Sequence, residues 1–167
     1  AKFEKALAAA TPPVPEAERP AQIASFKSLW SRVNATDAAR ELIDRTILKP
    51  AIEAIDTKFK DQPLVDAQLR HSLANLYLEL GMYAAALPLD TSALATRRRI
   101  LGDDHPDTLK TISDIGLVLQ SQGKLAESEP FRREALNGYR RVLGEDHPDT
   151  IVAISSMGFL LDRKSVV

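Results

Sequence analysis

The feature of this sequence that most constrains its fold is an internal repeat with a period of 42 residues. The thirteen residues RRRILGDDHPDTL, from Arg97 to Leu109, return as YRRVLGEDHPDTI, from Tyr139 to Ile151, with nine identical positions. A period of about 20 to 50 residues is typical of chains built from stacked units, because one unit alone cannot bury its apolar face. We therefore expect a row of similar units, each packed on the next.

An earlier copy of the unit is more diverged. When residues 59–100 are aligned with residues 101–142, they agree at spaced positions: Asp61/Asp103, Gly81/Gly123, Ala84/Ala126, Pro88/Pro130, Ala93/Ala135, Leu94/Leu136, Arg98/Arg140 and Arg99/Arg141. A third copy begins at residue 143 and supplies one helix only. The repeats are therefore assigned to residues 59–167, as units 59–100, 101–142 and an incomplete 143–167, or about 2.5 units.

Each unit has the pattern of two helices. The first helix of the second unit is predicted over residues 106–122, from the helical spacing of its apolar residues, which are Leu109, Ile112, Ile115 and Leu119. Asp104 or His105 is expected to cap this helix, because Pro106 suits a first helical turn. Gly123 is expected to end it, since glycine adopts the left-handed conformation without strain.

The second helix of this unit is predicted over residues 125–142. Its expected buried side consists of Leu125, Phe131, Ala135, Leu136, Tyr139 and Val142. Pro88 and Pro130 fall at the same place inside successive second helices, which predicts a repeated bend rather than a break. The basic runs Arg97 to Arg99 and Arg140 to Arg141 are predicted to be solvated, because both lie near a helix C-terminus, where cations are favoured.

The residues before the repeats are less regular. Residues 1–20 are expected to hold a short helix, Lys2 to Ala10, and a proline-rich spacer. Residues 21–58 are expected to form N-terminal helices that pack on the repeats. The first of these is predicted from Ala21 to Val33, and the next begins at Thr36 and is bent or restarted by Pro50.

The pattern of Leu101 to Thr108, LGDDHPDT, followed by a helix, a turn glycine and a second helix, resembles the 42-residue tetratricopeptide repeat of kinesin light chains and their bacterial relatives. The resemblance implies an all-α fold, a right-handed α-solenoid of helix pairs with N-terminal helices added. It places small residues at the site where helices pack closely, Ala74, Gly116 and Gly158. It also places large apolar residues nearby, first Leu73, Ile115 and Met157 and then Tyr77, Leu119 and Leu161.

Residues 39–69 are similar to the segment that leads into such repeats in bacterial serine/threonine protein kinases. This resemblance implies that a kinase domain accompanies the segment on the full-length chain. Residues 1–167 contain no kinase glycine-rich loop, HRD or DFG signature. The kinase domain is therefore expected outside them.

Composition and motifs exclude several other functions. The 22 Lys and Arg nearly balance the 23 Asp and Glu, which argues against a protein that coats nucleic acid. Apolar runs are too short for membrane insertion, and the absence of cysteine excludes thiolate sites. His105 and His147 lie in successive units and are expected about 10 Å apart, too far to share one metal ion. No cofactor, metal site or enzymatic activity is therefore expected.

The resemblance implies that the first helices of the units line a concave groove for extended peptides or helices of other proteins. The candidate partner-binding residues are His71, Asn75, Leu78, Lys110, Asp114, Leu117, Ser155 and Phe159. The apolar members Leu78, Leu117 and Phe159 are the expected anchors, and their alternative role is core between the units. The paired asparagines of kinesin light chains are absent, so their cargo preference does not transfer.

The sequence thus predicts a noncatalytic scaffold that binds a protein or peptide ligand, as a regulatory segment of a larger bacterial signalling protein. The alternative is a homo-oligomer formed through an open C-terminal end, where Met157, Leu160 and Leu161 are expected to be exposed. A further expectation is that Lys2 to Ala10 folds back into the groove. The compartment stays open, with the bacterial cytoplasm as default and an extracytoplasmic location as the other choice.

Overall fold

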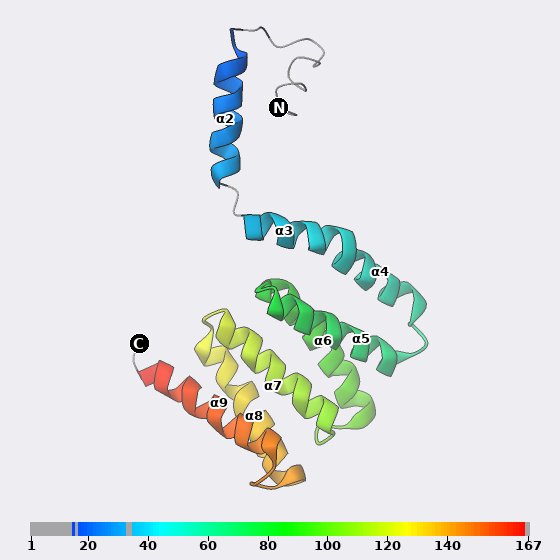
Figure 1. Ribbon diagram of the computed structural model, residues 1–167. Helices are drawn as coiled ribbons and strands as arrows, with labels where there is room; N and C mark the ends of the chain where they lie inside the picture. The colour runs from blue at the N-terminus through cyan, green and yellow to red at the C-terminus, as the bar shows by residue number, and fades with distance from the viewer. Residues whose placement is uncertain (1–14, 16, 33–34, 166–167) are drawn as a thin grey trace. The chain divides into compact units, whose positions relative to one another are not determined.

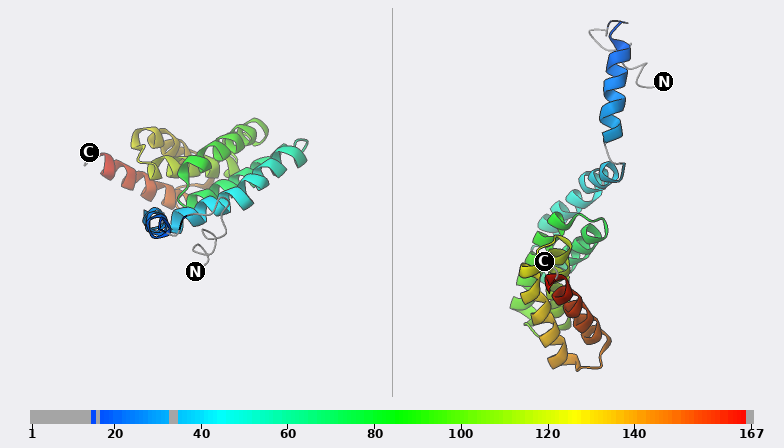
Figure 2. Two further views of the ribbon diagram at one scale, coloured as in Figure 1. Left: turned by 90° about the horizontal axis from the view of Figure 1, so that it is seen from above. Right: turned by 90° about the vertical axis from the view of Figure 1, so that its left-hand side faces the viewer.

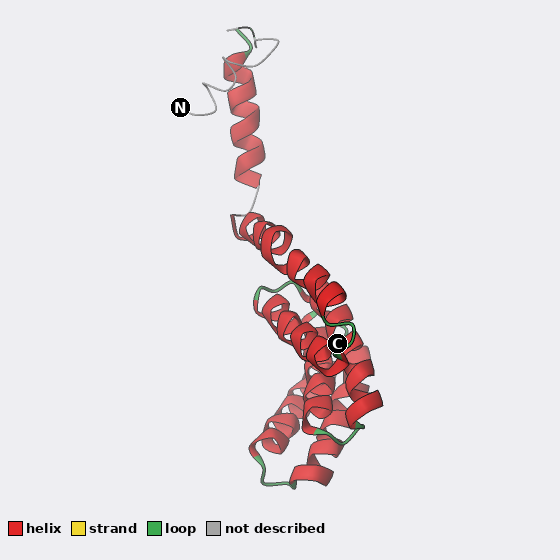
Figure 3. Ribbon diagram, turned by 90° about the vertical axis from the view of Figure 1, so that its right-hand side faces the viewer, coloured by secondary structure: helices red, strands yellow, loops and turns green. Residues whose placement is uncertain are grey.

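The computed structural model describes residues 15, 17–32 and 35–165, and in this part of the chain all regular structure is helical (Figures 1 and 3). The helices are α2 (Arg19–Arg32), α3 (Ala35–Ile43), the π-helical turn η1 (Asp44–Leu48), α4 (Lys49–Lys58), α5 (Pro63–Glu79), α6 (Tyr83–Leu101), α7 (Pro106–Ser121), α8 (Leu125–Leu143) and α9 (Pro148–Ser165). The predicted all-α fold class is confirmed. None of the described helices is both long and apolar enough to cross a bilayer.

The chain divides into two compact units, residues 1–47 and residues 48–167. The structure therefore groups α4 with the repeats, whereas the sequence-based division placed it with the N-terminal helices. The predicted helix from Lys2 to Ala10, and its proposed return to the groove, lie outside the described residues. Pro20 lies within α2 rather than in a spacer.

Helix α4 begins where the sequence predicted a bend or a restart. Pro50 lies in its first turn. The π-helical turn η1 directly precedes it, over Asp44–Leu48. Such single π turns are rare interruptions within α-helices. Leu48 has helical φ and ψ angles of −76° and −45°, so the helical backbone continues from η1 into α4.

The unit 48–167 is a succession of helix pairs, α5 with α6 and α7 with α8, followed by α9 (Figures 1 and 2). Each helix packs on the next along the chain, and α4 packs on α5 in the same way. The turn glycines Gly81 and Gly123 have positive φ angles of 73° and 78°. Both therefore adopt the left-handed conformation that the sequence predicted, which most other residues adopt only with strain.

The repeated HPD sequence is a helix cap. The side chain of His105 accepts a hydrogen bond from the backbone N–H of Asp107, and His147 accepts one from Asp149, each at 3.2 Å. One of the free N–H groups at each helix start is thereby satisfied. The prediction of a cap before Pro106 is confirmed, with His105 rather than Asp104 in that role.

Pro88 and Pro130 lie inside α6 and α8, as predicted, and neither breaks its helix. Each proline removes one backbone hydrogen bond near the start of a 19-residue helix, and the packing of both helices on their neighbours persists. Because the two prolines are equivalent in the repeat, the second helices of both units carry the same interruption.

The main core lies between α6, α7, α8 and α9. Its buried members are Leu94, Leu109, Ile112, Ile115, Leu119, Ala135, Leu136, Tyr139, Ala153, Met157 and Leu160. Val142, predicted to be buried, is exposed instead. It lies in the last turn of α8, at the position of the equally exposed Ile100 in α6, outside this core.

The prediction that Met157 and Leu160 are exposed is wrong. Both are buried in the core, because α9 packs on α8 through this side. Leu161 is exposed, as predicted. The open surface of α9 is therefore a different face from the one that holds Met157 and Leu160.

Candidate partner-binding surface

The predicted binding residues lie on three helices, α5, α7 and α9. Helix α5 carries His71, Asn75 and Leu78, α7 carries Lys110, Asp114 and Leu117, and α9 carries Ser155 and Phe159. Two observations join these helices into one surface. Nε2 of His71 on α5 lies 3.5 Å from Oδ2 of Asp114 on α7, and a hollow lies between α7 and α9.

The hollow has a volume of about 330 Å³ and is lined by Leu117 and Gln120 from α7, Arg132 from α8, and Ser155, Ser156 and Phe159 from α9. It brings together three predicted residues: Leu117, Ser155 and Phe159. Phe159 is 55% exposed, which favours a surface role for this ring over the alternative of core. Leu78 and Leu117 are half-buried.

Three of the lining residues, Gln120, Ser156 and Arg132, are not among the eight candidate contacts. Arg132 is the charged one. It is only 7% exposed, and its Nη2 donates a hydrogen bond to Oε1 of Gln120 at 3.2 Å. A Cβ atom on Gly116 would lie 2.9 Å from Cδ of Arg132, so the glycine makes room for this side chain. Burial lowers the pKa of Arg132, and the charge of Asp114 opposes that shift. The sequence signal that could have singled out Arg132 is its position, 42 residues after Asp90, where one repeat carries an acidic residue and the next a basic one.

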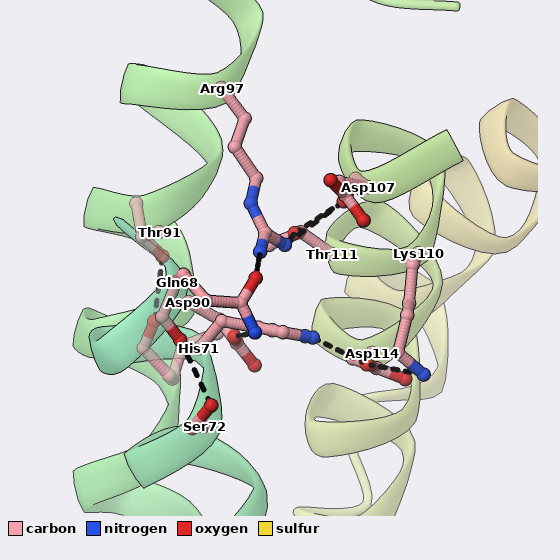
Figure 4. A network of polar contacts seen from close by, with 11 residues as sticks. Gln68, His71, Ser72, Asp90, Thr91, Arg97, Asp107, Lys110, Thr111 and Asp114 are labelled. Carbon is pink, nitrogen blue, oxygen red and sulfur yellow. Dashed lines mark hydrogen bonds and ion pairs between the residues drawn. The ribbon is translucent and has the colours of Figure 1, made fainter. Parts of the chain in front are cut away.

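His71, one of the predicted contacts, is buried at 3% exposure. Its Nδ1 lies 2.8 Å from Oδ1 of Asp90, and its Nε2 lies 3.5 Å from Oδ2 of Asp114 (Figure 4). Asp90 is buried in α6 and needs a polar partner there, which draws the imidazole inward. His71 can therefore act on a ligand only through its acidic neighbours.

Asp114 and Lys110 lie at the same part of the surface (Figure 4). Nζ of Lys110 is 4.0 Å from Oδ2 of Asp114, and the lysine side chain is mainly exposed, whereas the aspartate side chain is mainly covered. Burial raises the pKa of the Asp114 carboxyl. The charges of Lys110, His71 and Arg132 oppose this rise, and the charge of Asp90 adds to it. Lys110 is thus the accessible charge of the pair.

Arg97 is buried, so the prediction of a fully solvated basic run is wrong at this residue. Its guanidinium donates to the carbonyl oxygen of Asp107 at 3.0 Å, and to Thr111 and Gln68 at 2.5 Å each (Figure 4). It points from α6 toward α5 and α7, where these acceptors replace water. Arg98 pairs with Asp103 and Glu134, and Arg99 is exposed.

Asn75 and Ser155 are the remaining predicted contacts. Asn75 is half-buried on α5. Ser155 is exposed on α9, and its hydroxyl donates to the carbonyl oxygen of Ile151 at 3.0 Å, within the same helix. The hydroxyl oxygen can still accept a hydrogen bond from a ligand. The structure thus presents a mixed surface of amide, hydroxyl, ammonium and apolar groups.

Comparison with known proteins identifies the repeat. Two family models, each described as tetratricopeptide repeat, match residues 66–127 and residues 108–149. A solved crystal structure, of BtubC (BKLC) from P. vanneervenii, is similar to 98% of this chain with a TM-score of 0.61 and 17% identity. The chain spans 62% of that structure's length, and the likeness shows a shared fold. Comparison with curated proteins gave no match.

Proposed function

Because residues 66–149 of this chain are tetratricopeptide repeats, we propose that it is a noncatalytic scaffold that binds a peptide or helix of a partner protein. Repeats of this kind generally mediate protein–protein interaction. The proposed binding surface is formed by α5, α7 and α9. The observation that carries the proposal is the hollow between α7 and α9, where apolar, hydroxyl and amide groups from both helices meet one buried cation.

The proposed contacts have different roles. Leu78, Leu117 and Phe159 supply apolar anchors, because apolar and aromatic side chains dominate interface energies. Lys110, Asn75 and Ser155 supply hydrogen bonds, and Asp114 limits the charge of the surface. His71 is a positioning residue that acts through Asp114, at the 3.5 Å contact between their side chains.

The wider setting is also part of the proposal. The 42-residue period supports a unit of the kinesin-light-chain type. The resemblance of residues 39–69 to the segment preceding such repeats in bacterial serine/threonine protein kinases supports a regulatory segment of a larger signalling protein. In that setting, binding in the groove would determine which protein the signalling domain of the same full-length chain acts on.

A pull-down from lysate of the source cells tests the groove. The bait with added negative charge is Ser155→Glu, Phe159→Glu, in which two exposed residues of the hollow become acidic and the buried core residues are unchanged. The expected result is that a partner retained by the unmodified chain is lost, because two carboxylates enter an apolar contact. Mass spectrometry of the eluates measures this, and circular dichroism confirms that the bait is folded.

The matched control is Ala95→Glu, Asn137→Glu. It adds the same charge at exposed positions of α6 and α8 that are equivalent in the repeat. This bait should retain the partner. If the hollow variant and the control capture the same proteins as the unmodified chain, the groove is not the binding surface.

A second candidate function is self-assembly through α9. Three apolar residues of this helix, Ile151, Ile154 and Leu161, are 51%, 39% and 47% exposed. Their equivalents one repeat earlier, Leu109, Ile112 and Leu119, are 1%, 0% and 4% exposed, within the core that α7 shares with α8. A second copy of the chain could cover the open face, as α8 covers α7.

A further inference from the structure

The floor of the groove carries opposite charges in successive units. Asp90 of α6 and Arg132 of α8 are 42 residues apart and occupy the same position in their helices. Both side chains are buried, at 1% and 7% exposure. The repeat thus places one buried acid and one buried base beneath the same surface.

Among the described residues, only Asp90 of these two lies within ion-pair distance of a group that can carry the opposite charge. Asp90 lies against His71 at 2.8 Å. In the part of the chain that the structure describes, no carboxylate lies within ion-pair distance of Arg132, whose hydrogen bond goes to the neutral amide of Gln120. Its Nε is buried without a hydrogen-bond partner. The charge of Asp114 acts on Arg132 only from beyond ion-pair distance. A buried charge is costly unless it is paired, so an anion in direct contact would offset the cost of burying this guanidinium.

The hollow above Arg132 offers that anion a place. Ser155 and Ser156 of α9 add hydroxyl groups, and Leu117 and Phe159 form apolar walls. The volume of about 330 Å³ suits one side chain of a bound peptide with part of its neighbour. Gly116 leaves room for the Arg132 side chain, because a Cβ there would meet its Cδ and Cγ at 2.9 and 3.1 Å.

We propose that this hollow is a specificity site for the carboxylate of an Asp or Glu side chain in a bound peptide. Arg132 pairs with the carboxylate, and an adjacent apolar residue of the same peptide packs on Leu117 and Phe159. The proposal rests on the proposed function and names the residue type that the groove selects. A carboxylate fits better than a phosphate, because one buried guanidinium balances one negative charge, whereas a phosphate carries nearly two.

The test uses an array of short peptides with blocked ends, in pairs that differ only by Glu or Gln, or Asp or Asn, beside Leu or Phe. The unmodified chain should bind the acidic member of its preferred pairs about tenfold more tightly than the amide member, since charge-assisted hydrogen bonds are the strong ones. Arg132→Met should remove that preference and leave both members bound alike. Fluorescence polarisation of selected pairs measures the ratio.

The matched control is Arg133→Met, because Arg133 is the exposed neighbour of Arg132 on α8 and pairs with Glu129. It loses the same charge and should keep the preference for the acidic peptide. An unmodified chain with no preference, or an Arg132→Met variant that retains it, overturns the carboxylate site. The same holds if a phosphoserine peptide binds better than its glutamate counterpart.

Two further readouts separate this proposal from others. If the unmodified chain binds the acidic and amide peptides equally well and the Ser155→Glu, Phe159→Glu variant binds neither, the carboxylate site is overturned and the groove is supported. A chain that binds none of the peptides contradicts both.

Thermal unfolding of the free chain tests whether Arg132 is structural. Arg132→Met should unfold at the same or a higher temperature, and a fall of several degrees would overturn the proposal.

Discussion

Buried polar side chains join the first two repeats at the level of single residues. His71 of α5, Asp90 of α6 and Asp114 of α7 form one line of contacts, and Arg97 forms a second with Gln68 and Thr111 (Figure 4). Such groups favour one arrangement of the helices, because a shifted helix would leave a buried polar group without its partner. The register of the two repeats is thus set partly by polar contacts.

Asp114 is expected to make the folded chain less stable at neutral pH than an uncharged residue would. Burial raises its pKa above the ordinary 3.8, so between 3.8 and the raised value the folded state binds more protons than the unfolded state. Stability therefore falls as the pH rises through that window. Asp114→Asn should raise the urea midpoint at about pH 7, and the gain should shrink as the pH is lowered toward about 4.

Urea unfolding followed by circular dichroism at several pH values measures this. Asp146→Asn removes the same charge from an exposed position and serves as the control. An Asp114→Asn variant that is less stable than the unmodified chain at neutral pH would mean that the contacts with Lys110 and His71 outweigh the cost of burial.

At the scale of elements, two glycines inside helices differ in how closely a neighbouring helix packs against them. Gly138 of α8 faces the buried Leu109 of α7, and an added Cβ would lie 2.2 Å from Cδ2 of that leucine. Gly158 of α9 has no atom within 4 Å of an added Cβ. The two glycines therefore differ in environment although both lie inside helices.

Alanine substitutions at these glycines should have opposite effects. Gly138→Ala should destabilise the chain by about 1–3 kcal/mol, because Leu109 lies in the packed core and cannot move freely. Gly158→Ala should stabilise it by about 0.5–1 kcal/mol, since alanine favours helix and nothing obstructs it. Thermal or urea unfolding compares the pair. Equal effects of the two substitutions would show that the packing between α7 and α8 is looser than the structure has it.

At the scale of the whole molecule, α9 exposes an apolar face whose equivalents in the preceding repeats are covered. Ile151 and Leu161 of α9 are open, whereas Ala67 and Tyr77, which are two repeats earlier in the sequence, are 0% and 1% exposed. Apolar residues in one stripe mark an interaction site when they are rimmed by polar groups. This face is where self-assembly would occur.

Light scattering over a dilution series tests that assembly. A dimer of the unmodified chain should dissociate in Leu161→Glu, because a charge would enter its interface. The matched control is Leu76→Glu on α5, where a leucine of nearly the same exposure, 46% against 47%, is replaced. That variant should remain dimeric. A monomer at all concentrations contradicts the assembly and leaves the groove as the candidate surface.

Local signals in the sequence predicted much of the repeat fold. The turn glycines Gly81 and Gly123, and the cap expected at Asp104 or His105, act within a few residues of their position. The 42-residue period is visible in the sequence without knowledge of how the helices pack. Helical periodicity likewise predicted the courses of α7 and α8 to within a residue or two. These features determined the all-α architecture without tertiary information.

The tertiary structure alone decided which side chains of the repeats are available to a partner. Burial of His71 depends on Asp90, which is 19 residues away on another helix, and burial of Met157 and Leu160 depends on how α9 packs against α8. Arg132 enters the hollow because Gly116, on the facing helix, leaves it space. The sequence by itself determined where helices form and how they repeat, since those are local properties. The pairing of polar groups across helices is non-local, and only the packed structure decides it.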